Sequence, residues 1–167
     1  FSNRETLGNL TLIDKITNSF FQAFTSRTAG FSTIDFTHSR AGTDFVFMLL
    51  MFVGGASGSV AGGIKINTAM VLSIAALAAI RGRANIEVMR REIPYSQVAR
   101  ALALLILAAI GVIFFVLVLT YTELEKLDSG LFSFKDVMFE AISAFGTVGL
   151  SKGITSDLSD SGKLTLS

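Results

Sequence analysis

The chain of 167 residues is strongly apolar: 51% of its residues are hydrophobic, 16% are charged, and its mean hydropathy is +0.62. This composition lies outside ordinary soluble usage and indicates a membrane protein in contact with lipid. The charges nearly cancel, 14 Lys and Arg against 13 Asp and Glu, and Cys is absent, which argues against a nucleic-acid partner and excludes disulfides and cysteine nucleophiles.

The first apolar segment, about residues 16–26, is too short to cross a bilayer. It leads into a loop, 27–33, that contains Thr28-Ala29-Gly30-Phe31. About ten apolar residues beside full spans are typical of a re-entrant segment, because a spanning helix needs about 20. We therefore predict a pore helix over 16–26, ending in a loop whose backbone carbonyls face an ion path.

The second apolar region, about 44–80, is interrupted by glycine. Five of the ten residues from 54 to 63 are Gly, and each costs a continuous helix about 1 kcal/mol relative to Ala. Lipid cannot satisfy free backbone groups, so an interrupted span must be buried in protein or line a water-filled path. We predict one broken transmembrane helix. The alternative is an unbroken helix in which Gly54, Gly58 and Gly62 form a small-xxx-small contact.

A short basic loop, 81–99, separates this region from the next span. It contains four Arg between residues 81 and 91, so the positive-inside rule places it in the cytoplasm. The segment from about 100 to 122 carries no charge after Arg100 and is long enough to cross a hydrocarbon core of roughly 30 Å. We predict a multi-pass protein of the plasma (inner) membrane, with both pore loops on the outer side.

The combination of pore helix and loop occurs again near the C-terminus. A short apolar segment over about 134–145 precedes a loop, 146–151, that contains Thr147-Val148-Gly149-Leu150. The two Thr residues lie 119 positions apart, which predicts an internal repeat. Gly30 and Gly149 are the strongest candidates for function, because Gly permits close backbone packing and φ values that a β-carbon forbids.

The segment from 123 to 140, which follows the last span and extends into the second pore helix, is acidic. On the outer side it predicts a surface that attracts cations, and the alternative is a solvated loop without a role. Its five acidic residues, against Lys126 and Lys135, are Glu123, Glu125, Asp128, Asp136 and Glu140.

Three stretches together resemble the membrane subunit of the Trk/Ktr/HKT potassium transporters, most closely the Ktr branch. They are residues 20–33, 51–65 and 139–151, in the family order of third filter, broken inner helix and fourth filter. A subunit of that family holds four helix, pore-loop, helix repeats. The resemblance, over most of residues 3–155, implies an all-α membrane fold of K⁺-channel type, with re-entrant pore helices and one broken transmembrane helix.

The resemblance also implies a site. Backbone carbonyls of the two filters would bind the transported K⁺, and the glycine-rich loop would be a gate just below them. A Lys that snorkels to the membrane face is the alternative for Lys65. The filter residues are Thr28, Ala29, Gly30, Phe31, Thr147, Val148, Gly149 and Leu150; the gate residues are Gly54, Gly55, Ala56, Ser57, Gly58, Ser59, Gly62, Gly63 and Lys65.

By the same resemblance, residues 1–80 belong to the third repeat and 100–167 to the fourth. We expect a fragment of a longer subunit, because two filters cannot surround an ion alone and no initiating Met or signal peptide is visible. The expected partners are membrane lipid, the remaining half of the pore, a second copy of the full subunit and a cytosolic nucleotide-binding ring. K⁺ movement would be passive or Na⁺-coupled, with no organic cofactor in this chain.

Two other functions fit parts of the sequence. One is an unrelated cation channel or transporter with re-entrant loops. The other is a rhomboid-like intramembrane protease, because Gly55-Ala56-Ser57-Gly58 matches its nucleophile motif. A serine nucleophile needs a base within hydrogen-bond reach, and the only His, His38, lies upstream in a polar loop. We therefore predict that the chain is not an enzyme.

Overall fold

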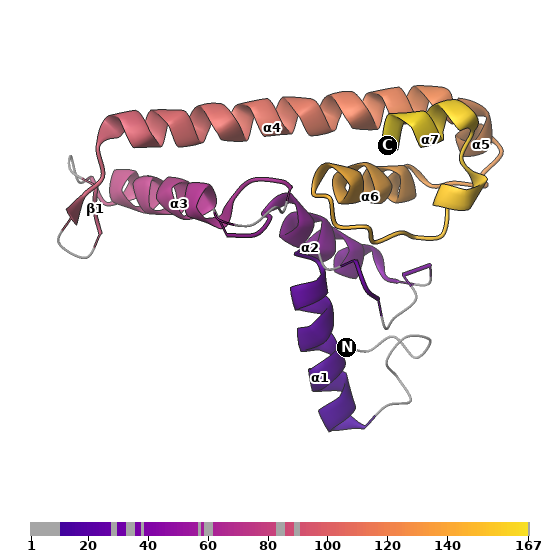
Figure 1. Cartoon of the computed structure of the whole chain (residues 1–167), viewed down its shortest axis with the longest axis horizontal. Coiled ribbons are helices and arrows are strands. Elements are labelled where there is room, and N and C mark those ends of the chain that lie inside the picture. The colour runs from indigo at the N-terminus through magenta and orange to yellow at the C-terminus, as the bar shows by residue number, and fades with distance from the viewer. Residues whose placement is uncertain are drawn as a thin grey trace.

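The computed structural model is almost entirely helical (Figure 1). It describes residues 11–27, 30–32, 36–37, 39–56, 58, 62–82, 86–88 and 91–166. The elements in chain order are α1 (Leu12–Thr25), α2 (Ala41–Phe52), α3 (Ile66–Ile80), β1 (Glu87–Val88), β2 (Arg91–Glu92), α4 (Tyr95–Thr122), α5 (Leu124–Asp128), α6 (Phe134–Phe145), η1 (Thr155–Asp157) and α7 (Asp160–Leu166).

The basic loop contains a small hairpin that the sequence did not predict. Strands β1 and β2 pair antiparallel, with Glu87 opposite Glu92 and Val88 opposite Arg91. Ile93 N–H also donates to the carbonyl of Ile86 at 2.8 Å and extends this pairing by one hydrogen bond. The loop is therefore partly ordered by backbone pairing, and an all-helical description holds for the remaining described elements.

Helix α4 is the one helix in the described part of the chain that is long and apolar enough to cross a membrane. It begins at Tyr95, five residues before the predicted start, because Pro94 precedes it with φ −66° and is already suited to a helix entrance. Its 28 residues span about 42 Å. Only 17% of its most apolar window is buried, so most of this surface is available to lipid.

The other helices lie along one side of α4 (Figure 1). Helix α3 runs beside the N-terminal half of α4, while α6 and α7 lie beside its C-terminal half. Helix α2 packs against α6, and α1 extends away from the rest of the structure. The hairpin thus lies at the N-terminal end of α4, away from α6 and α7.

Helix α6 is the centre of the packed core. One buried cluster joins it to α2 and to the loop that follows it, through residues such as Met51, Phe139 and Val148. A second cluster joins its other side to α4, through Leu119 and Val137. These van der Waals contacts fix α6 from both sides.

The start of α6 is set by its own sequence. The Ser133 side chain accepts from the backbone of Asp136, and Asp136 Oδ2 accepts from Ser133 N–H at 3.2 Å, which forms a capping box. Such caps stabilise a helix by about 1 kcal/mol. Asp136 is therefore a structural residue, although the sequence predicted it as part of an acidic outer surface.

Glu123 is also structural, and the prediction of an acidic surface is wrong for it. Its side chain is 1% exposed and ties the end of α4 to the start of α7. Oε1 accepts from Ser159 N–H at 2.9 Å and from the Ser159 hydroxyl, and Oε2 lies 2.8 Å from Lys126 Nζ. Burial alone would raise the pKa of Glu123, but Lys126 and Ser159 outweigh burial and lower this pKa below its ordinary value.

We expect Glu123→Gln to lower the unfolding temperature of the purified protein. Lys126 and Ser159 would lose a charged acceptor, at a cost of about 1–3 kcal/mol. Because the pKa of Glu123 is lowered on folding, its stabilisation is present above its ordinary pKa of 4.5 and is lost as the pH falls through the lower folded value.

Thermal scans at about pH 6 and about pH 3 measure this effect. Between these pH values, the wild type should lose more stability than the variant, which has no carboxylate to protonate at this position. Equal losses in the two proteins would contradict the assignment.

Candidate ion pathway

The end of α1 holds the first predicted filter loop. Gln22, Thr25 and Ser26 are buried there, and Gln22 Nε2 donates to the Ser32 hydroxyl at 3.1 Å. Gly30 has φ +71°, which a β-carbon disfavours. The neighbouring Phe31 side chain is exposed, whereas Thr28 and Ala29 lie outside the described residues.

The second predicted filter loop alternates buried side chains with exposed backbone. Val148 and Leu150 are buried in the core beside α6, whereas Thr147 and Gly149 are exposed. Val148 N–H donates to the carbonyl of Ser143 at 2.9 Å and fixes the loop to the helix end. Thr147 has φ +52° and Gly149 has φ +82°. A non-Gly residue with positive φ is uncommon and marks a backbone conformation that its surroundings impose.

The two loops meet in space. A β-carbon built on Gly30 would lie 3.0 Å from the Val148 carbonyl oxygen, and one on Gly149 would lie 3.7 Å from Gly30 Cα. Backbone therefore packs against backbone where the two loops approach each other. This contact joins segments from the two ends of the sequence, and a side chain at Gly30 would force the loops apart.

The glycine-rich break is a closed loop between two helices. Helix α2 ends at Phe52 and α3 begins at Ile66, so an unbroken helix is not what forms. At the base of the loop, Gly54 N–H donates to Ile64 O at 2.8 Å and Ile64 N–H donates to Phe52 O at 2.9 Å. A third bond runs from Ile66 N–H to Gly55 O at 3.2 Å. These bonds satisfy backbone groups that lipid cannot.

Two of the three regularly spaced glycines face each other inside this loop. A β-carbon on Gly54 would lie 2.0 Å from the Gly62 carbonyl oxygen, which leaves no room for any side chain. Gly58, by contrast, has open space around its α-carbon. The spacing of Gly54 and Gly62 therefore serves the closure of the loop and not a contact between two helices.

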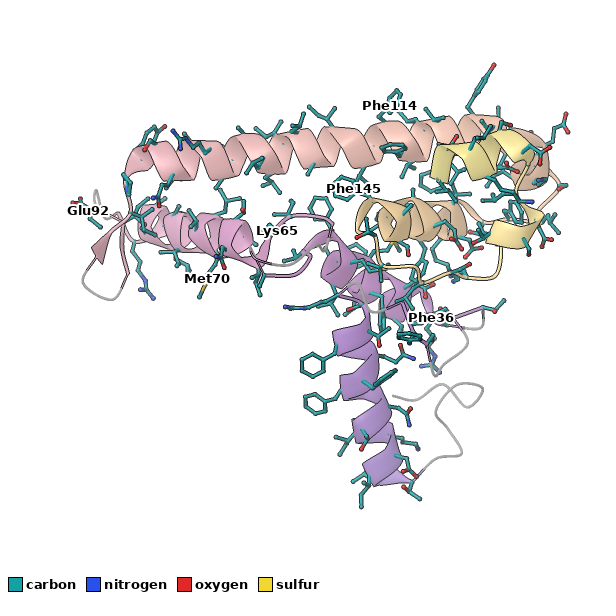
Figure 2. The ribbon with its side chains drawn as sticks, viewed as in Figure 1. Phe36, Lys65, Met70, Glu92, Phe114 and Phe145 are labelled. Carbon is teal, nitrogen blue, oxygen red and sulfur yellow. The ribbon has the colours of Figure 1, made fainter. Side chains whose placement is uncertain are left out.

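The glycine-rich loop touches the second filter loop directly. Gly62 N–H donates to the Thr147 hydroxyl at 2.9 Å. A β-carbon on Gly62 would lie 2.8 Å from the Phe145 carbonyl oxygen, and one on Gly146 would lie 2.8 Å from the Met51 carbonyl oxygen. Figure 2 shows Phe145 at the end of α6 that faces the break. The glycine-rich loop and the end of α2 thus both lie against the start of the second filter loop, at Thr147 and Gly146 respectively.

The structure describes four of the remaining predicted gate residues. Gly63 has φ +71° at the base of the loop, and Gly55 is half-buried beside it. Lys65 is half-buried immediately before α3, at the end of that helix nearest the break (Figure 2). Ala56 is exposed. Ser57 and Ser59 lie outside the described residues, as does His38 of the protease alternative.

A buried ionic cluster beside the second filter was missed from the sequence. Asp44, in the first turn of α2, is fully buried, and its Oδ2 lies 2.7 Å from Nζ of the buried Lys152. Lys152 Nζ also lies 3.1 Å from Asp136, and Lys135 Nζ lies 3.0 Å from Asp44. The available signal was an acidic residue beside an apolar run, which usually implies a specific partner.

Glu140 completes the support of the second filter loop, so the predicted acidic surface is wrong for this residue too. It is 4% exposed. Its Oε1 accepts from the Ser151 hydroxyl at 2.6 Å and from Lys152 N–H at 2.9 Å, and Oε2 accepts from the Thr155 hydroxyl at 3.0 Å. Burial would lower the pKa of Lys152, but its bonds to Asp44 and Asp136 outweigh burial and raise this pKa above its ordinary value.

These features define a class of protein: a helical membrane protein in which two loops with Gly at positive φ lie against each other and a broken helical region lies against one of them. The chain matches the family model described as TrkH, cation transport protein, over residues 3–167. It therefore belongs to the TrkH cation transport family, and the resemblance to the Trk/Ktr membrane subunit is confirmed.

Several curated relatives are similar over nearly the whole chain. Ktr system potassium uptake protein B of Bacillus subtilis (strain 168) is 41% identical over 98% of this chain and 35% of the relative. Potassium/sodium uptake protein NtpJ of Enterococcus hirae is 38% identical over 98% of this chain and 36% of the relative. Ktr system potassium uptake protein B of Vibrio alginolyticus is 36% identical over 96% of this chain and 34% of the relative. The chain thus spans about a third of the length of these relatives.

We expect Gly62→Ala to destabilise the protein by about 1–3 kcal/mol, because its methyl group would collide with the backbone of Phe145 and Gly146. The matched control is Gly58→Ala in the same loop, where no atom lies within 4 Å of the added carbon. Thermal unfolding of the two variants measures the difference. Equal stability would contradict the close approach of Gly62 to the filter.

Proposed function

We propose that this chain supplies part of a potassium path, in which the two Gly-containing loops act as quarters of one carbonyl-lined filter. The observation that carries the proposal is the meeting of Gly30 with Val148 and Gly149. Rings of backbone carbonyls replace the water shell of a monovalent cation, and the exposed backbone at Gly30 and Gly149 suits that role. The candidate ligands are the backbone groups of residues 28–31 and 147–150.

We propose further that residues 54–65 form a gate beside this filter. The supporting contact is the hydrogen bond from Gly62 N–H to the Thr147 hydroxyl at 2.9 Å. The loop is closed at its base by backbone bonds and carries Lys65 at its end. Such a loop can move as a unit about its base while α2 and α3 remain in place, which is the property that a gate requires.

The complete transporter is also a proposal, because the chain spans about a third of its relatives. Two filter loops need a further half to surround an ion, so we place the activity in a longer subunit, and in a homodimer of it. The relatives named Ktr system proteins support a multi-component assembly, with a cytosolic nucleotide-binding ring as the proposed partner. The basic loop 81–99 would face that ring, and the filters would open outward.

The name of one relative bears on whether a second ion is transported with K⁺. The relative from Enterococcus hirae is named as a potassium/sodium uptake protein, which supports Na⁺ as a second ion. Membership of the TrkH family replaces the alternative of an unrelated channel. It also argues against the protease, because the relatives are named as uptake proteins and not as enzymes.

The filter proposal is tested by Gly149→Ser in a complete subunit that carries this sequence. We expect loss of high-affinity K⁺ uptake and a lower K⁺/Na⁺ preference in cells that lack their own K⁺ uptake. A side chain at φ +82° would distort the loop where the two filters meet.

Gly130→Ser is the matched control for this strain. Gly130 also has positive φ, +76°, but lies in the loop between α5 and α6 with nothing near its α-carbon. Its variant should keep wild-type uptake and ion preference. Unchanged uptake and preference in Gly149→Ser would overturn the filter assignment.

The gate proposal is tested with a single thiol, since the chain has no Cys. In an otherwise cysteine-free subunit, modification of Gly58→Cys by a bulky thiol reagent should block K⁺ uptake, because Gly58 lies on the proposed gate with open space around it. Modified Gly130→Cys should retain uptake. Full uptake after verified labelling at position 58 would contradict the gate.

A further inference from the structure

Helix α2 contacts the second filter loop region at both of its ends. At its last turn, Met51 and Phe52 lie against the start of that loop, where a β-carbon on Gly146 would meet the Met51 carbonyl and the Phe52 and Phe145 rings stack with centroids 6.1 Å apart. At its first turn, Asp44 lies 2.7 Å from Lys152, the residue directly after the loop. One helix from the first half of the chain therefore holds both ends of a filter from the second half.

Lys152 is fixed by more than this ion pair. Its backbone N–H donates to Glu140 at 2.9 Å, and its ammonium group lies 3.1 Å from Asp136. Asp44 in turn accepts from the Ser39 hydroxyl and pairs with Lys135 at 3.0 Å. The side chains of Asp44 and Lys152 are 0% and 3% exposed. The end of the filter loop is thus attached to both α2 and α6.

A buried ion pair of this kind is weak evidence for stability alone. The cost of removing two charges from water often equals or exceeds the attraction between them. Apolar residues of similar size in the same positions frequently stabilise the folded protein as much as the ion pair does. An ion pair does, however, restrict the relative orientation of the two side chains, because each charged group is satisfied by few arrangements of its partner. The position of this pair, one residue beyond the filter, puts that directional constraint where carbonyl geometry matters most.

We propose that Asp44 and Lys152 are a positioning pair that fixes the outer end of the second filter loop and so sets its ion preference. This inference rests on the proposed function of that loop as a filter. Neither residue contacts the ion in this scheme. They act through the backbone of residues 149–151, whose carbonyl spacing decides how well K⁺ is bound relative to the smaller Na⁺.

The inference is tested by Asp44→Asn, Lys152→Met and the double variant in a complete subunit. We expect each single variant to raise the apparent KM for K⁺ and to lower the K⁺/Na⁺ preference several-fold. The double variant should be less impaired than the sum of the two, because it leaves no lone charge of this pair buried. Transport is normalised to the amount of subunit in the membrane.

Two controls separate positioning from folding. Glu123→Gln weakens another buried carboxylate site outside the filter, where Glu123 at the end of α4 pairs with Lys126 in α5 and accepts from Ser159 before α7, so it should reduce abundance while KM and K⁺/Na⁺ preference stay at wild-type values. Asp44→Glu keeps the charge and should retain most of the ion preference. If Asp44→Asn does not reach the membrane, the double variant carries the measurement.

The outcomes distinguish this inference from the proposed function. A wild-type subunit that fails to restore K⁺ uptake would overturn the proposed function itself. A wild-type subunit that transports K⁺, with single and double variants that keep its KM and its K⁺/Na⁺ preference, would overturn the positioning role alone. A raised KM and lower preference in the single variants, absent in Glu123→Gln, supports it.

Discussion

Backbone hydrogen bonding in a medium without water is the constraint on which the rest of this structure depends. Lipid accepts no hydrogen bond from an interrupted helix, so every free N–H and C=O group in the break needs a partner within the protein. The bonds among Phe52, Gly54 and Ile64 provide partners at the base of the loop. The bond from Gly62 to Thr147 provides one from another segment. The bond that satisfies Gly62 thus also joins the break to the loop after α6.

Glycine makes that convergence sterically possible. Gly30, Gly54, Gly62 and Gly146 each lie where a β-carbon would meet backbone at 3.0 Å or less. Backbone can shift only by moving whole segments, so these contacts fix the relative positions of the two Gly-containing loops and the break between α2 and α3. Gly62 is also joined to the loop after α6 by the hydrogen bond from its N–H to the Thr147 hydroxyl.

Charge provides the second layer of organisation. Four charged side chains are buried to a degree that would be too costly for an unpaired ion, and each has a partner from another element. They are Asp44, Glu123, Glu140 and Lys152. These pairs join α2 to the second filter loop, α4 to α7, and α6 to the residues beyond the filter. Apolar packing around α6 brings the elements together, and the charged pairs determine their relative orientation.

The sequence alone determined the class, the family and the order of the longer apolar helices. Apolar length distinguished α4 from the shorter α1 and α6, glycine content located the break between α2 and α3, and the two Thr-x-Gly loops indicated a repeat. These signals are local, because each depends on a few neighbouring residues.

The tertiary structure decided which residues meet. An acidic residue reads the same in sequence whether it faces water or an ion pair, so Glu123 and Glu140 were assigned to a surface although both are buried. Helix α4 begins at Tyr95, directly after Pro94 and five residues before the apolar span predicted from about residue 100. The partnership of Asp44 with Lys152 joins positions 108 residues apart, and only the packing of α2 on α6 brings them together.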